Sequence, residues 1–162
     1  MPRRKAAKAR RARTDEPAGA PINFGPLANW VGFNLRMAQE ATFEAFSHLS
    51  HEVGEKPGRF ATLTLIAENP GISQTALSQA SGRDKSSLTP VLVDLVRRGL
   101  VRRERMPGDR RSYRLNLTAE GERTLAKLNA CARRHEKNLD RIIGSERTRF
   151  LAVLRKIFAE IR

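Results

Sequence analysis

Apolar residues recur at helical spacing over long stretches near both ends of the chain. From Leu27 to His51 they fall on more than one side of the predicted helix, which therefore needs a second neighbour, such as a partner subunit, besides its own core. A second long helix, capped by Thr118, is predicted to run to about Ile143, and Ser145 is expected to cap a last helix with a clean apolar stripe. These terminal helices predict a dimerisation surface.

Shorter helices are predicted between the terminal ones, the first of them over residues 60–67. Ser73 is a good N-cap for the next helix, which ends at Gly82, and Asp84 caps a third that runs to Gly99. Two short helices joined by about three residues that include a glycine form a helix-turn-helix. The segment therefore predicts this DNA-binding motif.

Pro90 leaves two interpretations of the third short helix open. In one, the helix starts after Asp84 and Pro90 kinks it by removing one internal hydrogen bond. In the other, Thr89 is the N-cap and Pro90 is the first helical residue. Helical periodicity fits both.

A hairpin is predicted directly after the helix-turn-helix. Residues 100–106 lack helical spacing, residues 107–109 are a turn signal, and residues 112–117 alternate between polar and apolar as in a half-buried strand. We therefore expect a mainly α fold with a small β-hairpin wing (α+β), that is, a winged helix-turn-helix. The expected division is an arm and linker (1–26), dimerisation helices (27–52 and 119–162) and a DNA-binding domain (56–118).

The charge of the chain indicates a polyanionic partner. Its 162 residues include 31 Lys and Arg against 17 Asp and Glu, a formal net charge of +14. No apolar run approaches the roughly 20 residues that span a bilayer, and no apolar core follows the basic start as in a signal peptide. We therefore expect nucleic acid inside the cell, and no membrane, as the partner. A single cysteine, Cys131, excludes a disulfide framework and a zinc site built on cysteine pairs.

Two short segments hold nearly all of the excess charge. Residues 1–13 carry seven basic side chains and no acid, and residues 97–114 carry eight arginines against Glu104 and Asp109. The first segment predicts a disordered arm, and whether that arm contacts DNA stays open. The second falls on the predicted hairpin and is expected to form a cationic prong beside the third short helix.

The segments DKSSLT (84–89), LVRRGLV (95–101) and DRRS (109–112) together resemble the MarR family of bacterial transcriptional regulators. Residues 84–89 (DKSSLT) are similar to the start of that family's recognition helix, and residues 95–101 (LVRRGLV) to its exit into the wing. Residues 109–112 (DRRS), followed by Leu115, Leu117, Thr118 and Gly121, resemble the wing and the start of the next helix. The resemblance runs from about Leu27 to the C-terminus.

The resemblance implies a cytoplasmic, nucleoid-associated homodimer that binds a near-palindrome in double-stranded DNA, most often as a repressor. It also favours the longer, kinked recognition helix. Family members that sense peroxide carry a cysteine in the first helix, which is absent here, so oxidant sensing is not expected. Residues 30–46 resemble regulators that respond to aromatic acids or their coenzyme A thioesters, which predicts a small-molecule effector and no cofactor.

In this context the polar side of the recognition helix is expected to face DNA. Hydroxyl groups there can bond phosphates or base edges, and a proline can contact a thymine methyl. The expected contacts from this region are Lys85, Ser86, Ser87, Thr89 and Pro90, together with Arg83. On the wing, Arg103, Arg105 and Arg110 are expected to contact phosphates. Arg111 is the expected minor-groove arginine, oriented by Asp109.

An effector site is expected between the dimerisation helices and the winged helix. Its predicted aromatic and apolar lining is Trp30, Phe33, Met37 and Phe60. Arg36 and Arg59 are the predicted partners for an anionic group of the effector. His48 and His51 lie three residues apart on one predicted helix, but no further ligand cluster accompanies them, so no metal site is predicted.

Two other classes of function compete with a regulator. A non-specific architectural nucleic-acid-binding protein would have the same charge. An enzyme is not favoured, because the sequence shows no nucleophile–base pairing, no paired carboxylates and no phosphate-binding glycine loop.

Overall fold

The computed structural model describes residues 22–106 and 109–161, and of residues 106 and 109–112 it describes the backbone alone. The chain divides into two compact units, one ending at Met37 and the other beginning at Ala38. Each unit is described by itself below.

The first unit holds a 3-10 helix, η1 (Gly25–Asn29), and the first turns of α1 (Val31–His51). Trp30 has extended backbone angles and separates the two helices. The prediction of one helix from Leu27 was therefore wrong by one turn, because Pro26 starts the short helix instead. Asn34 donates hydrogen bonds to two carbonyl groups of this break, and the rings of Phe24 and Phe33 lie 5.6 Å apart.

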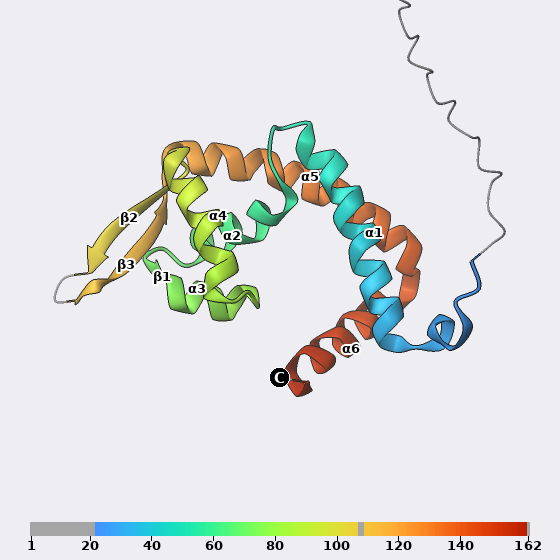
Figure 1. Cartoon of the computed structure of the whole chain (residues 1–162). Helices are drawn as coiled ribbons and strands as arrows, with labels where there is room; N and C mark the ends of the chain where they lie inside the picture. Colours follow the sequence, from blue (N-terminus) through green and yellow to red (C-terminus); the bar gives the residue numbers. More distant parts are fainter. Residues whose placement is uncertain (1–21, 107–108, 162) are drawn as a thin grey trace, which may run out of the picture. The chain divides into compact units, whose positions relative to one another are not determined.

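The second unit contains the winged helix. In chain order its elements are α2 (Pro57–Glu68), β1 (Ile72–Ser73), α3 (Gln74–Ser81), α4 (Lys85–Arg97), β2 (Val101–Met106) and β3 (Asp109–Leu117). The strands form one antiparallel sheet in the order β1-β3-β2, and Figure 1 shows the β2–β3 hairpin projecting from the helices. The two-residue strand β1 was not predicted, because it is too short to show alternation.

The predicted helix caps of this unit are confirmed. The side chains of Ser73, Asp84 and Thr118 each accept a hydrogen bond from the amide three residues later. Gly82 ends α3 with a φ of 67°, in the left-handed region. Pro90 lies inside α4, so the longer helix capped by Asp84 is confirmed and the one capped by Thr89 is wrong.

The core of the second unit is aliphatic. It joins α2, α3, α4, the sheet and the first half of α5 (Ala119–Ile143). Its buried side chains are Leu63, Ile66, Leu77, Leu88, Leu92, Leu95, Leu100, Val101, Leu115, Leu125 and Leu128. The buried residues of α4 are Leu88, Leu92 and Leu95, which share one side of the helix, so its remaining side faces outward.

The C-terminal part of the chain continues through η2 (Gly144–Glu146) into α6 (Arg147–Glu160). The prediction that Ser145 caps the last helix is wrong: Ser145 lies within η2, and Glu146 precedes α6 without a side-chain cap. Gly144, with a φ of 59°, ends α5, and the short η2 turn takes up the two residues after it. In the described part of the chain, no helix is long and apolar enough to cross a membrane.

The first turn of α5 packs tightly on the turn that leads into β2. A Cβ at Gly121 would lie 2.0 Å from the backbone oxygen of Leu100, which also accepts a hydrogen bond from the amide of Thr118. We expect Gly121→Ala to lower the free energy of unfolding by about 3 kcal/mol, because backbone has to move to admit the methyl group. Gly32→Ala is the matched control, since a Cβ there meets no atom within 4 Å. Urea titration followed by circular dichroism measures both, and equal stabilities would contradict the close packing.

Candidate functional site

The exposed side of α4 begins with hydroxyl groups gathered around its N-cap. The hydroxyl of Ser86 donates to Oδ1 of Asp84 at 2.5 Å, and the hydroxyl of Ser87 donates to the Asp84 carbonyl at 3.1 Å. The hydrogen bonds from Ser86 and from the Ser87 amide hold the pKa of Asp84 at about 2. Both hydroxyl oxygens therefore remain as acceptors at the start of the helix, beside the exposed side chain of Lys85.

Thr89 joins the two helices of the helix-turn-helix. Its hydroxyl donates to the Lys85 carbonyl at 2.7 Å and accepts from Nε2 of Gln74, on α3, at 2.9 Å. The residue predicted as a DNA contact thus also sets the spacing of α3 and α4. Pro90, next to it, is exposed.

Val93 is an exposed residue of α4 that the sequence analysis missed. It lies one turn after Pro90, and 53% of its surface is exposed. Positions 86, 90, 93 and 97 share one side of a helix. An apolar side chain on this otherwise polar side is suited to contact a thymine methyl group. The spacing of three residues between Pro90 and Val93 was the sequence signal that could have identified Val93.

The wing presents two arginines on one side of the hairpin. Arg103 and Arg105 are both exposed, and because they are two residues apart on β2 they point to the same face. The guanidinium of Arg103 lies 4.3 Å from the centre of the Tyr113 ring, a cation–π contact that limits its motion. Arg102, on the other face, pairs with Glu104 at 3.0 Å. The side chains of Asp109, Arg110 and Arg111 lie outside the described residues, so their roles stay predictions.

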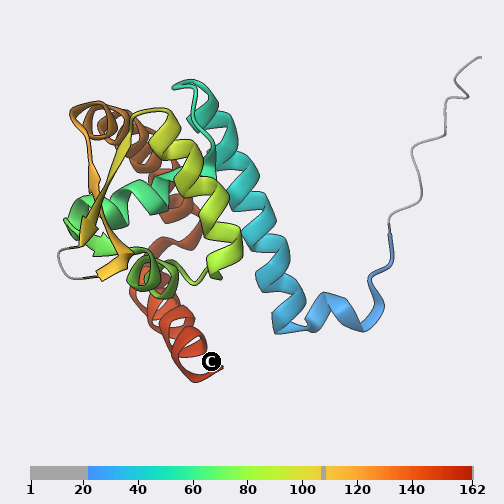
Figure 2. The same cartoon turned by 60° about the vertical axis from the view of Figure 1, so that its left-hand side comes forward.

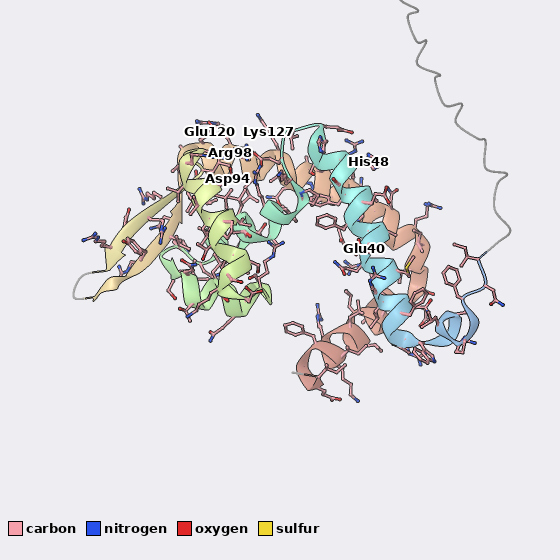
Figure 3. All side chains as sticks on the ribbon, in the orientation of Figure 1. Glu40, His48, Asp94, Arg98, Glu120 and Lys127 are labelled. Atoms are coloured by element: carbon pink, nitrogen blue, oxygen red, sulfur yellow. The ribbon has the colours of Figure 1, made fainter. Side chains whose placement is uncertain are left out.

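The prediction of a cationic prong is wrong for Arg98, because Arg98 pairs with a buried acid. Arg98 makes two hydrogen bonds to the carboxylate of Glu55, a residue of which only 4% is exposed. Arg59 bridges Glu55 at 2.9 Å and Asp94 at 2.5 Å, and Arg97 also pairs with Asp94, at 2.6 Å. Asp94 and Arg98 lie one turn apart at the C-terminal end of α4 (Figure 3). The cluster therefore ties α4 to the segment before α2.

The protonation of Glu55 follows from the same contacts. Burial alone would raise the pKa of this carboxyl group. The hydrogen bonds from Arg98 and Arg59, and the positive charge of both guanidinium groups, together outweigh that effect and lower the pKa below its usual 4.5. Glu55 is therefore ionised at neutral pH, although it is buried.

A cavity of about 510 Å³, the first cavity, lies between α1, α2 and α5. Phe60, one of the predicted effector residues, lines it, and its ring lies 5.5 Å from that of Phe46, which also contacts His135 at 5.7 Å. The full lining is Gln39, Thr42, Phe43, Phe46, Phe60, Asn129, Ala132, Arg133, His135 and Glu136. Aromatic walls with a few polar groups suit an aromatic ligand that carries polar substituents.

The lining of this cavity does not test the other predicted effector residues. Trp30, Phe33, Arg36 and Met37 belong to the unit that ends at Met37, within which Trp30 and Met37 are exposed. Both terminal nitrogens of Arg59 are occupied by Glu55 and Asp94. Their roles toward an effector stay predictions.

Arg83 lies beside the start of α2. A Cβ at Gly58 would lie 3.0 Å from Nη2 of Arg83, and the Arg83 carbonyl accepts from the Ser78 hydroxyl at 2.6 Å. Arg83 is half-buried and lines a further cavity of about 630 Å³, the second cavity, so its predicted DNA contact stays untested. Among the described residues, no three His, Cys, Asp or Glu side chains lie close enough together to hold a metal ion.

Known proteins place this arrangement in a family. The model of the MarR family matches residues 56–113. A protein of Thauera aromatica, assigned as a transcriptional regulator for the hcr operon, is 34% identical over 143 residues, which are 87% of this chain and 86% of the relative. The chain belongs to the MarR family.

Solved structures agree with that membership. The transcriptional repressor CouR, bound to a 23-mer DNA duplex, is 34% identical with a TM-score of 0.77, over 87% of this chain and all of that one. CouR has also been solved with p-coumaroyl-CoA, at 31% identity, with a TM-score of 0.76 over 86% of this chain and 98% of that one. PcaV of Streptomyces coelicolor, in complex with its natural ligand, is 26% identical with a TM-score of 0.77, over 89% of this chain and all of that one.

The predicted family and the mainly α winged-helix fold are thereby confirmed. The prediction of a transcriptional regulator rather than an enzyme is confirmed as well, since the relatives are regulators and repressors.

The buried ion cluster is expected to stabilise this MarR-family fold in a pH-dependent way. Glu55→Gln leaves Arg98 without its counter-charge and Arg59 with Asp94 alone, which should lower the free energy of unfolding by about 2 kcal/mol at pH 7. The lowered pKa means that the stabilisation is complete above pH 4.5 and is lost as the pH falls below it. The difference between variant and wild type should therefore shrink in acid.

Thermal unfolding between pH 3 and pH 7 measures this difference. Glu52→Gln is the control, because Glu52 pairs with Arg134 on the surface, where about half of each side chain is exposed. That change should leave the stability close to that of the wild type at every pH. A Glu55→Gln variant as stable as the control at pH 7 would contradict the role given to the cluster.

Proposed function

We propose that the chain is an effector-responsive repressor that binds a pseudo-palindromic operator as a homodimer. The outward side of α4, lying beside a wing that presents Arg103 and Arg105, carries this proposal. A helix with a polar side of this kind fits the major groove, and the wing arginines reach the flanking phosphates.

In this proposal α4 reads bases and the wing fixes the register. Lys85, Ser86, Ser87 and Pro90 face the groove, and Val93 is added to them as an apolar contact. Arg103, Arg105 and Arg110 bind phosphates, and Arg111, oriented by Asp109, enters the minor groove. The arm over residues 1–26 adds sequence-independent, salt-sensitive affinity.

Homodimerisation explains the apolar side chains left exposed near the C-terminus. Ile142 at the end of α5 and Phe150, Val153 and Ile161 in or just after α6 are each more than 40% exposed. Exposed apolar patches of this kind mark interaction surfaces. We assign residues 27–52 and 119–162 to the dimerisation region and residues 56–118 to DNA binding.

The effector is proposed to be an aromatic acid or its coenzyme A thioester, held in the first cavity. The aromatic walls of this cavity and the p-coumaroyl-CoA complex of CouR support this class of ligand. Trp30, Phe33, Arg36 and Met37 are also proposed as effector-binding residues. Binding would favour a separation of the two α4 helices that no longer fits half-sites one turn apart. The protein would act on chromosomal DNA in the cytoplasm.

Sequence specificity separates this function from that of an architectural protein. Fluorescence anisotropy should give at least a hundredfold tighter binding to the DNA upstream of the protein's own gene than to a shuffled duplex of equal length. Equal affinities would favour the architectural alternative. Release of the specific duplex by p-coumarate or its thioester then tests the effector.

Arg105→Ala should weaken binding to both duplexes. Loss of one phosphate contact lowers the slope of log affinity against log salt by about one. Arg123→Ala is the control, because Arg123 on α5 is already paired with Glu120 at 2.6 Å. An unchanged slope for Arg105→Ala would remove β2 from the proposed interface.

Val153→Glu should convert the dimer to a monomer. The substitution replaces an apolar side chain with a charged one. Val153 is 49% exposed in the single chain and is proposed to be buried between subunits. Sedimentation velocity at micromolar concentration measures the mass, with Ala152→Glu on the polar side of α6 as control. A dimeric Val153→Glu protein would place the subunit contact elsewhere.

A further inference from the structure

The second cavity lies between the C-terminal part of α1, the start of α2 and α4. Residues of α1 and of α4 both line it, and Figure 2 views the molecule from the side on which α4 lies in front. Phe43 lines both this cavity and the first one. The two cavities are therefore neighbours that meet at Phe43.

The two cavities differ in charge. Lys56, Arg59 and Arg83 line the second cavity against one acid, Asp94, which is already paired with Arg59 and Arg97. Among the described side chains, no carboxylate lies within salt-bridge distance of Lys56 or Arg83. No described carboxylate therefore neutralises the positive charges of Lys56 and Arg83. Both residues line the cavity, and its wall also contains Pro57, Pro90 and Val91. Cations gathered in a concave site with low-dielectric walls concentrate anions.

Local packing holds Arg83 at this position. Gly58 leaves room for its guanidinium, because a Cβ there would lie only 3.0 Å from Nη2. The Arg83 carbonyl is held by the Ser78 hydroxyl at 2.6 Å, which anchors the backbone between α3 and α4. A guanidinium can bind two phosphate oxygens at once, and a lysine such as Lys56 adds a point charge.

We propose that the second cavity binds the phosphate groups of a coenzyme A thioester, with Lys56 and Arg83 as phosphate ligands. The aromatic acyl group of the same molecule occupies the first cavity, and this step rests on the proposed function. The charge left over beside Phe43 therefore selects thioesters over free aromatic acids. Ser47 and His51 supply further polar groups along the α1 wall.

Isothermal titration of the full chain with three probes tests this division. p-Coumarate reports on the first cavity, coenzyme A on the second and p-coumaroyl-CoA on both. We expect the thioester to bind at least tenfold more tightly than either part. Lys56→Ala and Arg83→Ala should each weaken binding of coenzyme A and of the thioester about tenfold, and leave p-coumarate within twofold.

Two further variants complete the design. Phe60→Leu should weaken p-coumarate and the thioester but not coenzyme A. Lys127→Ala, which removes an exposed lysine on α5 that lines neither cavity, should change none of the three (Figure 3). Lys56 is itself exposed, so its variant retains the fold, and circular dichroism checks all four proteins.

The outcomes separate this inference from the proposed function. If p-coumarate binds and depends on Phe60 while Lys56→Ala and Arg83→Ala leave thioester binding unchanged, the inference is wrong and the proposed function stands. If those two variants weaken operator DNA but not coenzyme A, the cations serve DNA and the inference is again wrong. If coenzyme A binding depends on them but p-coumarate does not bind, the aromatic site fails instead. If none of the three probes binds, both fail.

Discussion

The burial of the Glu55 carboxylate is the constraint on which the position of α4 depends. A charged group out of water is stable only when opposite charges and hydrogen-bond donors are fixed around it. Here the donors come from Arg59 at the start of α2 and from Arg98, just after α4. Any rotation of α4 against α2 would separate charges in a poorly solvated place. The direction in which the outward side of α4 points is therefore fixed by ion pairs at the C-terminal end of the helix.

Features that depend on local chemistry could be predicted from the sequence. The caps at Ser73, Asp84 and Thr118 each involve a side chain and an amide three residues away, so spacing alone locates them. The pairing of Arg98 with Glu55 could not be predicted, because Glu55 lies 43 residues earlier in the chain. A count of charges in one segment does not distinguish an arginine that faces solvent from one that neutralises a buried acid. A periodic pattern cannot reveal a strand of two residues such as β1. It also does not locate the start of α1, at Val31, to within one turn.

The functional site also combines features that the sequence could predict with features that it could not. The polar side of α4 was predicted because the apolar positions of one helix determine which residues remain for the other side. The exposure of Val93 and the second use of the Thr89 hydroxyl depend on the neighbouring helix α3 and on the core, neither of which periodicity describes. Phe43 and Phe46 lie inside the segment that resembles regulators of aromatic catabolism, but only the packing of α1 on α2 and α5 shows which of its aromatic rings line a cavity.

Pro90 within α4 has a consequence for solvation. Proline has no amide hydrogen, so the carbonyl of Ser86, four residues earlier, receives none from that position. Ser86 is exposed, and its carbonyl oxygen can therefore keep a water molecule while the side chain next to it turns toward Asp84. Interfaces between proteins and DNA are commonly wet, and ordered waters can carry specificity. The backbone of α4 thus keeps one carbonyl oxygen that can accept a hydrogen bond from solvent, independent of any side chain.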